Sequence, residues 1–475
     1  MQRTTLYISA TIFLVAFFIY TMSPITPQSD SLWEVYVAER LVKTGKPDLD
    51  IYRQLISPDD YRIENVNGHL YSVYPLGTPL MAAPIVGVID IIGSRLFGGM
   101  SLSAYLLIHT PNSTLFLVEK MIASILTAIN CVIIFALGRY YLNTAKAIIL
   151  TIIFAFATSA WSVASRGLWQ HGPSMLCLSL TVYILIVGQK KPRLVPLAGF
   201  PLAFSFLIRP TNVISIGLFT IYVWFAYRKY WIYYILCLAA VFVPFIIYNY
   251  SIYSSIFSPY YSPQKLGNSP FLLEALAGNL VSPARGLFIF SPILILSIFG
   301  FSRTFRKFRL GQNFINIYLF GAIVLHWIVI SLFKDWGGGW SIGPRYFSDM
   351  IPYFICFLIP VLDGLSLSRN SLPVIRLGTI GFVIITIFSI FVHYRCSVDY
   401  GPTEWNIKPD ISITQSRLWD WSDIQFLRGL CPSGGLEAPK CWYETKVYPK
   451  PNSMLHVPSP DYSEYLFDMV SISDR

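Results

Sequence analysis

Long apolar runs, separated by short polar segments, repeat along most of the chain. A helix that crosses a lipid bilayer needs about 20 mostly apolar residues, so these runs predict membrane-spanning helices. Several runs are short and must borrow flanking residues to reach that length. The first run is not clearly followed by a small-residue cleavage site, so we interpret it as a retained helix rather than a signal peptide. We expect about eleven spans, with apolar centres at residues 7–20, 115–137, 147–164, 175–187, 194–208, 213–227, 231–248, 286–301, 315–333, 350–365 and 377–392.

The composition agrees with this pattern. Hydrophobic residues make up 54% of the 475 residues, and charged residues only 13%. An ordinary soluble domain carries about 25% charged and about 45–50% apolar residues. These values exclude a disordered chain and disfavour a single soluble globule. The predicted fold class is therefore an all-α polytopic membrane protein.

The net charge of +10 raises the question of a nucleic-acid partner. In a membrane protein, however, excess Lys and Arg usually marks the cytoplasmic loops. We therefore expect no nucleic-acid partner, and we use the basic residues to assign sidedness instead.

One further segment, residues 76–92, is apolar but contains Pro79, Pro84 and two glycines. It could span the membrane or lie on its surface. If it does not span, the inner short loops hold about twice as many Lys and Arg residues as the outer ones, and if it spans, the two sets exchange sides. We therefore predict a pair of interfacial helices here, an N-terminus in the cytoplasm and a C-terminus outside.

This topology divides the chain into two regions. Residues 1–394 form the predicted transmembrane domain, in which residues 22–113 are one long outer loop that is rich in acids. Residues 395–475 form a small polar region outside the membrane. Its tryptophans could stack on glycan or pack against the outer loops. Cys431 and Cys441 could form a disulfide in an oxidising compartment, and the cysteine spacing fits no zinc site.

The most distinctive local pattern, S-D-S-L-W-E-V-Y-V-A-E-R-L, follows the first predicted span. Its apolar residues recur at helical spacing, which predicts an amphipathic helix at the outer interface with Asp30 at its N-terminus. A carboxylate fixed at a membrane surface could act as a general base, or Asp30 could simply cap the helix. Glu34 in this helix and His69 further along the loop are weaker candidates for substrate binding.

Two outer-side segments combine basic residues with features that suit anion binding. K-D-W-G-G-G-W-S-I-G-P-R-Y contains Lys334 and Arg345, and its glycine-rich backbone could approach a ligand closely. V-S-P-A-R-G-L-F contains Arg285 at a membrane boundary. The planar Arg fork suits phosphate oxygens. Arg345 could instead pair with Asp349 or with lipid headgroups, and Arg285 could extend to headgroups.

Two further outer segments contain candidate side chains. Gln170 and His171 lie in the predicted turn between the third and fourth spans, and Arg209 in L-I-R-P-T-N ends an apolar run. A lone His is more often structural than catalytic, whereas an Arg at membrane depth suggests a functional site unless it caps a helix.

The chain has no Walker, HExxH or GxSxG motif, and its predicted spans contain almost no acids. Polar residues gather at the outer face, which disfavours a transporter with a polar central cavity.

These segments resemble the GT-C superfamily of membrane glycosyltransferases. The resemblance rests on the Asp after the first span, the interfacial segment with Y-P-L-G-T-P-L-M-A-A-P, and the segments R-P-T-N, S-P-A-R-G-L-F and W-S-I-G-P-R-Y. It covers roughly residues 7–393, and it is closest to the bacterial protein O-mannosyltransferases and aminoarabinose transferases. It implies a GT-C-like helix bundle in the bacterial inner membrane, with the active site on the outer side.

The resemblance also implies a reaction. A polyprenyl-phosphate sugar enters from the membrane, Asp30 deprotonates an acceptor hydroxyl, and that hydroxyl displaces the lipid phosphate with inversion. The sugar stays open, and the acceptor could be a lipid, a glycan or a protein. The residues expected to bind the donor phosphate are Arg345, Arg285 and Lys334. The residues expected to contact substrate are His171, Gln170, Arg209, Glu34 and His69.

Two departures from the family pattern bear on cofactors. Many relatives carry two adjacent acids in the first outer loop, whereas here Asp30 is followed by Ser31. Many also carry an acid in the second outer loop, where this chain has Gln170 and His171. We therefore expect transfer without a metal or other cofactor, with a divalent metal as the less favoured alternative. Rival functions are transport or flipping of lipid-linked glycans and a non-catalytic role in envelope assembly.

Overall fold

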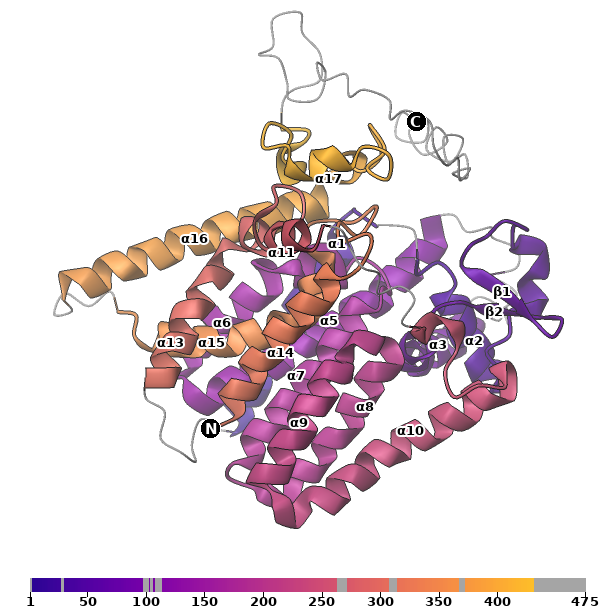
Figure 1. The fold of residues 1–475 in the computed structure, drawn as a ribbon, viewed down its shortest axis with the longest axis horizontal. Helices are drawn as coiled ribbons and strands as arrows, with labels where there is room; N and C mark the ends of the chain where they lie inside the picture. Colours follow the sequence, from indigo (N-terminus) through magenta and orange to yellow (C-terminus); the bar gives the residue numbers. More distant parts are fainter. Residues whose placement is uncertain are drawn as a thin grey trace, which may run out of the picture.

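The structure is a computed structural model and forms a bundle of helices with one short hairpin (Figure 1). It describes residues 2–26, 30–96, 102, 106, 113–262, 271–306, 314–366 and 372–430. The helices are α1 (Gln2–Met22), α2 (Glu34–Thr44), α3 (Gly77–Leu96), α5 (Ser113–Tyr141), α6 (Thr144–Phe156), α7 (His171–Gly188), α8 (Gly199–Ile208), α9 (Val213–Ala226), α10 (Trp231–Tyr253), α11 (Leu272–Val281), α12 (Leu287–Phe290), α13 (Leu296–Arg306), α14 (Phe314–Ser331), α15 (Ile351–Asp363), α16 (Pro373–Val398) and α17 (Gly401–Glu404). The short 3-10 helix η9 (Arg345–Met350) leads into α15.

Among the residues that the structure describes, eight helices are long and apolar enough to cross a membrane. They are α1, α3, α5, α7, α10, α14, α16 and the continuous helix of η9 and α15. All of these except α3 coincide with predicted spans. The remaining predicted spans fall on shorter apolar helices, namely Thr144–Phe156, Pro192–Ile208, Pro210–Ala226 and Pro292–Phe305. The predicted class, an all-α multi-pass membrane protein, is confirmed.

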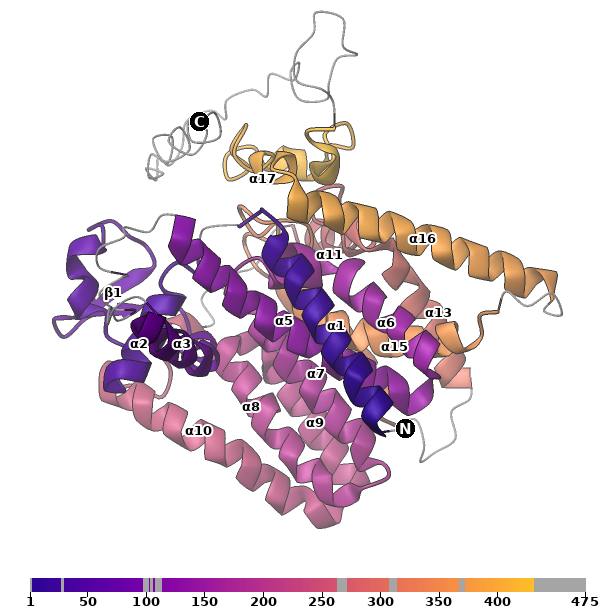
Figure 2. The same cartoon turned by 180° about the vertical axis from the view of Figure 1, so that it is seen from behind.

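Helix α3 occupies the segment in which we predicted two interfacial helices, and it is one continuous helix instead. Pro79 lies in its first turn, where the missing N–H removes no helical hydrogen bond, and the helix continues through Pro84. Figure 2 shows α2 and α3 nearly end-on, whereas α1 and α5 are seen from the side. Helix α3 therefore packs beside α2 and runs across the direction of the bundle helices.

The centre of the bundle is formed by α5 and α7. Helix α5 packs against α1, α6 and α7, and α7 packs against α8. The outer helices α10 and α16 instead leave large apolar side chains exposed, such as Ile247 and Ile384. A helix in water would bury such side chains, so these surfaces suit contact with lipid.

The first outer loop has a hydrophobic core of its own. Trp33, Tyr36 and Tyr52 are buried together with side chains from α3 and α5. The rings of Tyr36 and Tyr52 meet edge to face, with centroids 4.8 Å apart. Helix α2 ends at Gly45, whose φ of 70° is left-handed. This core holds the start of α2 against the bundle.

A two-stranded antiparallel hairpin follows in the same loop. Strands β1 (Ile63–Val66) and β2 (His69–Ser72) pair so that Ile63 lies opposite Ser72. Their connection is Asn67-Gly68, and both residues have positive φ, as a tight hairpin turn of this type requires.

Both views place the N-terminus at one end of the bundle and the hairpin and α17 towards the other (Figures 1 and 2). The first outer loop and the described part of the C-terminal region therefore lie away from the N-terminus. The pair Cys431 and Cys441 lies outside the described residues.

Candidate active site

The structure contains a cavity of about 880 Å³ between the first outer loop and the ends of the bundle helices. This volume suits a small molecule or the head of a larger ligand. One part of its lining is aromatic and apolar, formed by Phe206, Val213, Ile214, Phe257, Val329 and Phe333. The other part is polar and holds most of the residues singled out in the sequence, namely Asp30, Glu34, Gln170, His171, Arg209, Lys334 and Arg345.

Asp30 is held by a cation and two phenols. Its Oδ2 lies 3.2 Å from Nη1 of Arg345, and the hydroxyl of Tyr61 donates to Oδ1 at 3.2 Å. Tyr74 forms a further side-chain hydrogen bond with the carboxylate. About a third of the Asp30 side chain (35%) stays exposed, so the group is held but reachable.

The ionised form of Asp30 is favoured by these partners. Burial alone would raise the pKa of Asp30, but the guanidinium of Arg345 and the hydrogen bonds from Tyr74 and Tyr61 outweigh it and hold the pKa below its usual range. Helix α2 begins only at Glu34, and no side chain caps it. Asp30 therefore does not cap the helix, and its charge is balanced by Arg345 rather than by the helix dipole.

Arg345 is the first residue of η9 and follows the glycine-rich loop. Gly338, Gly339 and Gly343 have φ of 71°, 57° and 53°, which side chains with a Cβ rarely adopt. The loop turns back on itself, and Nη2 of Arg345 donates to the carbonyl of Gly338 at 3.1 Å. The guanidinium also lies 4.8 Å from the ring centroid of Trp169. These contacts fix the fork on the side of Asp30.

Arg209 and His171 share a second, deeper carboxylate. Nε of Arg209 lies 3.0 Å from Oδ2 of Asp349, and Nδ1 of His171 lies 3.8 Å from Oδ1 of the same side chain. Nη1 of Arg209 lies 2.8 Å from Nε2 of His171 and also contacts Nδ1 of the same ring. Asp349 is fully buried. Asp349 therefore pairs with Arg209, and Arg345 pairs with Asp30, which answers the alternative left open in the sequence.

The other polar lining residues differ in how they are held. The carbonyl oxygen of the Gln170 side chain accepts from the hydroxyl of Tyr260 at 3.0 Å. Lys334 has no ion-pair partner among the described residues, and it lines the same cavity as Arg345. Glu34 is buried, and its Oε2 has no hydrogen-bond partner among the described residues. Burial, and then the charges of Glu119 and Asp30, raise the pKa of Glu34 well above its usual value.

Two sequence candidates lie away from the cavity. Arg285 is buried, and its guanidinium donates to the carbonyls of Gly337 and Gly339 and to the side chains of Gln425 and Asn406. Its donors are therefore occupied by the protein. His69 is exposed on the hairpin and pairs with Asp50, 2.5 Å from Nδ1 to Oδ2.

Three residues of the site had little or no signal in the sequence. Tyr61 and Tyr74 reach Asp30 from the hairpin segment, and only Tyr74 lies in a recognisable motif, at the start of Y-P-L-G. Trp169 lies beside Gln170 in the turn before α7. Local sequence spacing does not predict these contacts, because the hydrophobic core of the outer loop brings the segments together.

Metal-ligating side chains do not gather at this site. Within the described ranges, no group of three or more His, Cys, Asp or Glu side chains could hold a metal ion. The positive charge in the cavity comes instead from Arg345, Arg209 and Lys334.

No family model and no curated protein matches this chain. Solved structures do match its fold. The oligosaccharyltransferase of Archaeoglobus fulgidus in the apo form is similar with a TM-score of 0.52 and 12% sequence identity, over 95% of this chain and 61% of that chain. The same archaeal protein in complex with an inhibitory peptide and a dolichol-phosphate is similar with a TM-score of 0.51 and 12% identity, over 94% and 62%.

The chain has the fold of this archaeal protein. At 12% identity this likeness shows a shared fold, and it does not single out the mannosyltransferase or aminoarabinose transferase group that the sequence resembles. The chain spans less than two thirds of the length of the archaeal protein.

Proposed function

We propose that this chain is a membrane glycosyltransferase that moves a sugar from a polyprenyl-phosphate-linked donor to an acceptor hydroxyl at the outer face of the membrane. The observation that carries the proposal is the partly exposed, ionised carboxylate of Asp30 in a cavity with one cationic part and one apolar part. Such a cavity suits a donor whose phosphate is charged and whose chain is apolar. The likeness to an oligosaccharyltransferase solved with a dolichol-phosphate supports this choice.

In this reaction Asp30 is the general base. One of its carboxylate oxygens takes the proton of the acceptor hydroxyl while the hydroxyl oxygen bonds to the anomeric carbon of the sugar. The bond from that carbon to the phosphate oxygen breaks, and its electron pair leaves with the polyprenyl phosphate. Attack opposite to the leaving group inverts the anomeric configuration. The exposed third of the Asp30 side chain gives the acceptor access.

The pairing of Asp30 with Arg345 suits the changes in charge that occur during this reaction. Before transfer, the guanidinium balances the ionised carboxylate at 3.2 Å. When Asp30 takes the proton, it becomes neutral, and the charge of Arg345 is free to stabilise the leaving phosphate. Lys334 and Arg209 line the same cavity and add positive charge to that end.

We further propose that the protein lies in the bacterial inner membrane with the cavity on the extracytoplasmic side, as the basic inner loops indicate. The acceptor remains a lipid, a glycan or a protein. Transfer needs no metal in this proposal, because the cations that face the phosphate are side chains of the chain itself.

The proposal is tested by surface-glycan composition in a deletion strain complemented with wild-type protein, Asp30→Asn or Asp59→Asn at matched protein level. Asp59 is an exposed acid of the same outer loop and serves as the matched control. We expect Asp30→Asn to lack the same sugar as the deletion, and Asp59→Asn to resemble wild type. With purified protein, Asp30→Asn should transfer sugar about 10²–10⁴-fold more slowly.

An Asp30→Asn strain with a wild-type glycan would contradict the assignment of the base. A glycan that is lost in the deletion but restored by Asp30→Asn would favour transport or flipping of lipid-linked glycans, since movement of a lipid needs no proton acceptor at this position.

A further inference from the structure

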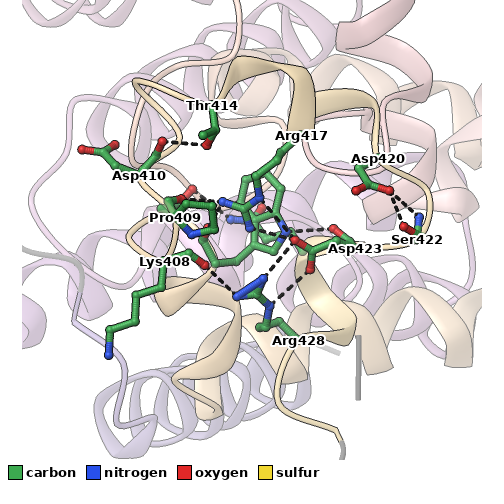
Figure 3. A network of polar contacts seen from close by, with 12 residues as sticks. Lys408, Pro409, Asp410, Thr414, Arg417, Asp420, Ser422, Asp423 and Arg428 are labelled. Carbon is green, nitrogen blue, oxygen red and sulfur yellow. Dashed lines mark hydrogen bonds and ion pairs between the residues drawn. The ribbon is translucent and has the colours of Figure 1, made fainter. Parts of the chain in front are cut away.

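The C-terminal segment, residues 401–430, folds around one buried carboxylate. Oδ2 of Asp423 lies 2.8 Å from Nη2 of Arg417 and 2.9 Å from Nη2 of Arg428 (Figure 3). The guanidinium of Arg417 also stacks over Trp405, 4.1 Å from the ring centroid. Breaking a buried ion pair leaves an uncompensated charge, so these contacts give the segment a defined shape.

Side chains from two parts of the helical bundle hold this segment. Nη2 of Arg395, near the end of α16, donates to the carbonyl of Arg428 at 2.7 Å. The hydroxyl of Ser282, after α11, donates to the carbonyl of Leu418. The segment is therefore fixed in place relative to the helices, and its inner face meets the glycine-rich loop.

Three buried side chains clamp the backbone of that loop. Oε1 of Gln425 accepts from the N–H of Gly343 at 3.0 Å, and its Nε2 donates to the carbonyl of Ser341 at 2.9 Å. Nδ2 of Asn406 donates to the same carbonyl at 3.0 Å. Arg285 is held by Gln425 and Asn406, and it donates to two further loop carbonyls.

The clamped loop in turn fixes Arg345. The N–H of Arg345 donates to the carbonyl of Gly343 at 2.9 Å, and its guanidinium donates to Gly338. Glycines with positive φ are flexible when they are free, so this loop owes its shape to the partners around it. A continuous set of contacts runs from Gln425 through the loop to the ion pair with Asp30.

We propose that the C-terminal segment is a positioning element of the active site, with Gln425 as the residue that sets the loop and, through it, Arg345. This rests on the proposed transferase function. It gives Arg285 a role different from phosphate binding, as part of the clamp. The alternative is that the segment only covers the bundle.

The first test needs no substrate. Hydrogen–deuterium exchange of the purified full-length protein is compared for wild type, Gln425→Ala and Gln415→Ala. Gln415 is an exposed glutamine of the same segment and is the matched control. We expect faster exchange in peptides that cover residues 337–346 for Gln425→Ala only. Unchanged protection of those peptides would overturn the proposal.

The second test uses the pH profile of sugar transfer. If Gln425 acts through Arg345, then Gln425→Ala weakens the partner of Asp30, and the acidic limb of kcat/KM moves up by about half a pH unit or more. We also expect kcat/KM to fall about 10-fold at neutral pH. The pH at which this acidic limb falls does not depend on what fraction of the protein is folded. A lower rate with an unmoved limb would overturn the proposal.

A second variant and the exchange experiment cover two outcomes in which the first variant gives no transfer data. If Gln425→Ala does not accumulate in the membrane, Asn406→Ala removes the other donor to Ser341 and should give smaller changes of the same sign. If the wild-type protein transfers no sugar from any polyprenyl-phosphate donor, the proposed function fails, and the exchange experiment still decides whether Gln425 fixes the loop.

Discussion

The guanidinium of Arg345 lies 3.2 Å from the carboxylate of Asp30, although 315 positions separate the two residues in the chain. One comes from the first outer loop and the other from the start of the helix formed by η9 and α15. Both residues line the polar part of the cavity. Its strength should be visible in how activity depends on pH.

We expect the acidic limb of kcat/KM to lie below the usual pKa of an Asp side chain, about 3.9. Arg345 is the main cause that lowers the pKa of Asp30, so activity should stay flat from about pH 8 to pH 5. In Arg345→Gln the burial of Asp30 remains and its counter-charge is lost, so the limb should move above that usual value. An unchanged limb would mean that Asp30 is not the base whose titration limits transfer.

Tyr61→Phe should lower kcat/KM by about 10-fold. The change removes one charge-assisted hydrogen bond from the phenol to the ionised carboxylate of Asp30, and such a bond contributes about 1.5 kcal/mol or more. Tyr71→Phe on strand β2 of the same hairpin is the control and should match wild type. Equal loss in both variants would point to damage of the hairpin rather than to a contact with Asp30.

The sequence predicts which residues lie near Asp30 better than it predicts which of them contact each other. Hydrophobic runs place the helices, because burial in lipid depends on local composition. Since the outer ends of neighbouring helices converge, Asp30, His171, Arg209, Lys334 and Arg345 could be expected at one face. Which of them would pair could not be predicted, because each partner is fixed by tertiary packing.

Arg285 and α3 are two further cases in which the sequence did not predict the local structure. Arg285 looked like a phosphate ligand, since it is an outer-side Arg at an apolar boundary, but its partners Asn406 and Gln425 lie 121 and 140 positions away. The prolines of α3 suggested a break between two helices, but Pro79 lies in the first turn, where no helical hydrogen bond is lost, and the helix continues through Pro84 in its interior.

Glu34→Gln should keep transfer activity and stabilise the protein at neutral and alkaline pH. The raised pKa of Glu34 means that its contribution to stability is complete below the unfolded-state pKa and is lost as pH rises towards the folded-state value. Gln keeps the neutral form at every pH. Thermal unfolding in detergent should therefore show a growing difference in Tm from pH 5 to pH 8. A loss of transfer in Glu34→Gln would show that the ionised carboxylate is needed.

Transfer by purified protein should survive treatment with a chelator. The cavity presents Arg345, Arg209 and Lys334 to an anion, which supply the positive charge that a metal would otherwise bring. The measurement is the transfer rate before and after EDTA, and again after Mg²⁺ or Mn²⁺ is added. Activity that disappears with EDTA and returns with either metal would contradict transfer without a metal.

Asp349→Asn should be the most destabilising of these changes. It leaves Arg209 buried without its counter-charge, which costs about 3–5 kcal/mol when one partner of a buried pair is removed. Transfer should fall as well, because Asp349 is the counter-charge of Arg209, and Arg209 lines the cavity. Unfolding in detergent and the transfer rate measure the two effects separately.

The double variant Asp349→Asn with Arg209→Gln separates charge from position. Both members of the pair are then neutral, so most of the lost stability should return, because coupled residues do not contribute additively. Transfer should stay low, since the cavity has lost one of its cations. If the double variant is as unstable as the sum of the two single ones, the pair is not coupled in the way that the 3.0 Å contact between Arg209 and Asp349 requires.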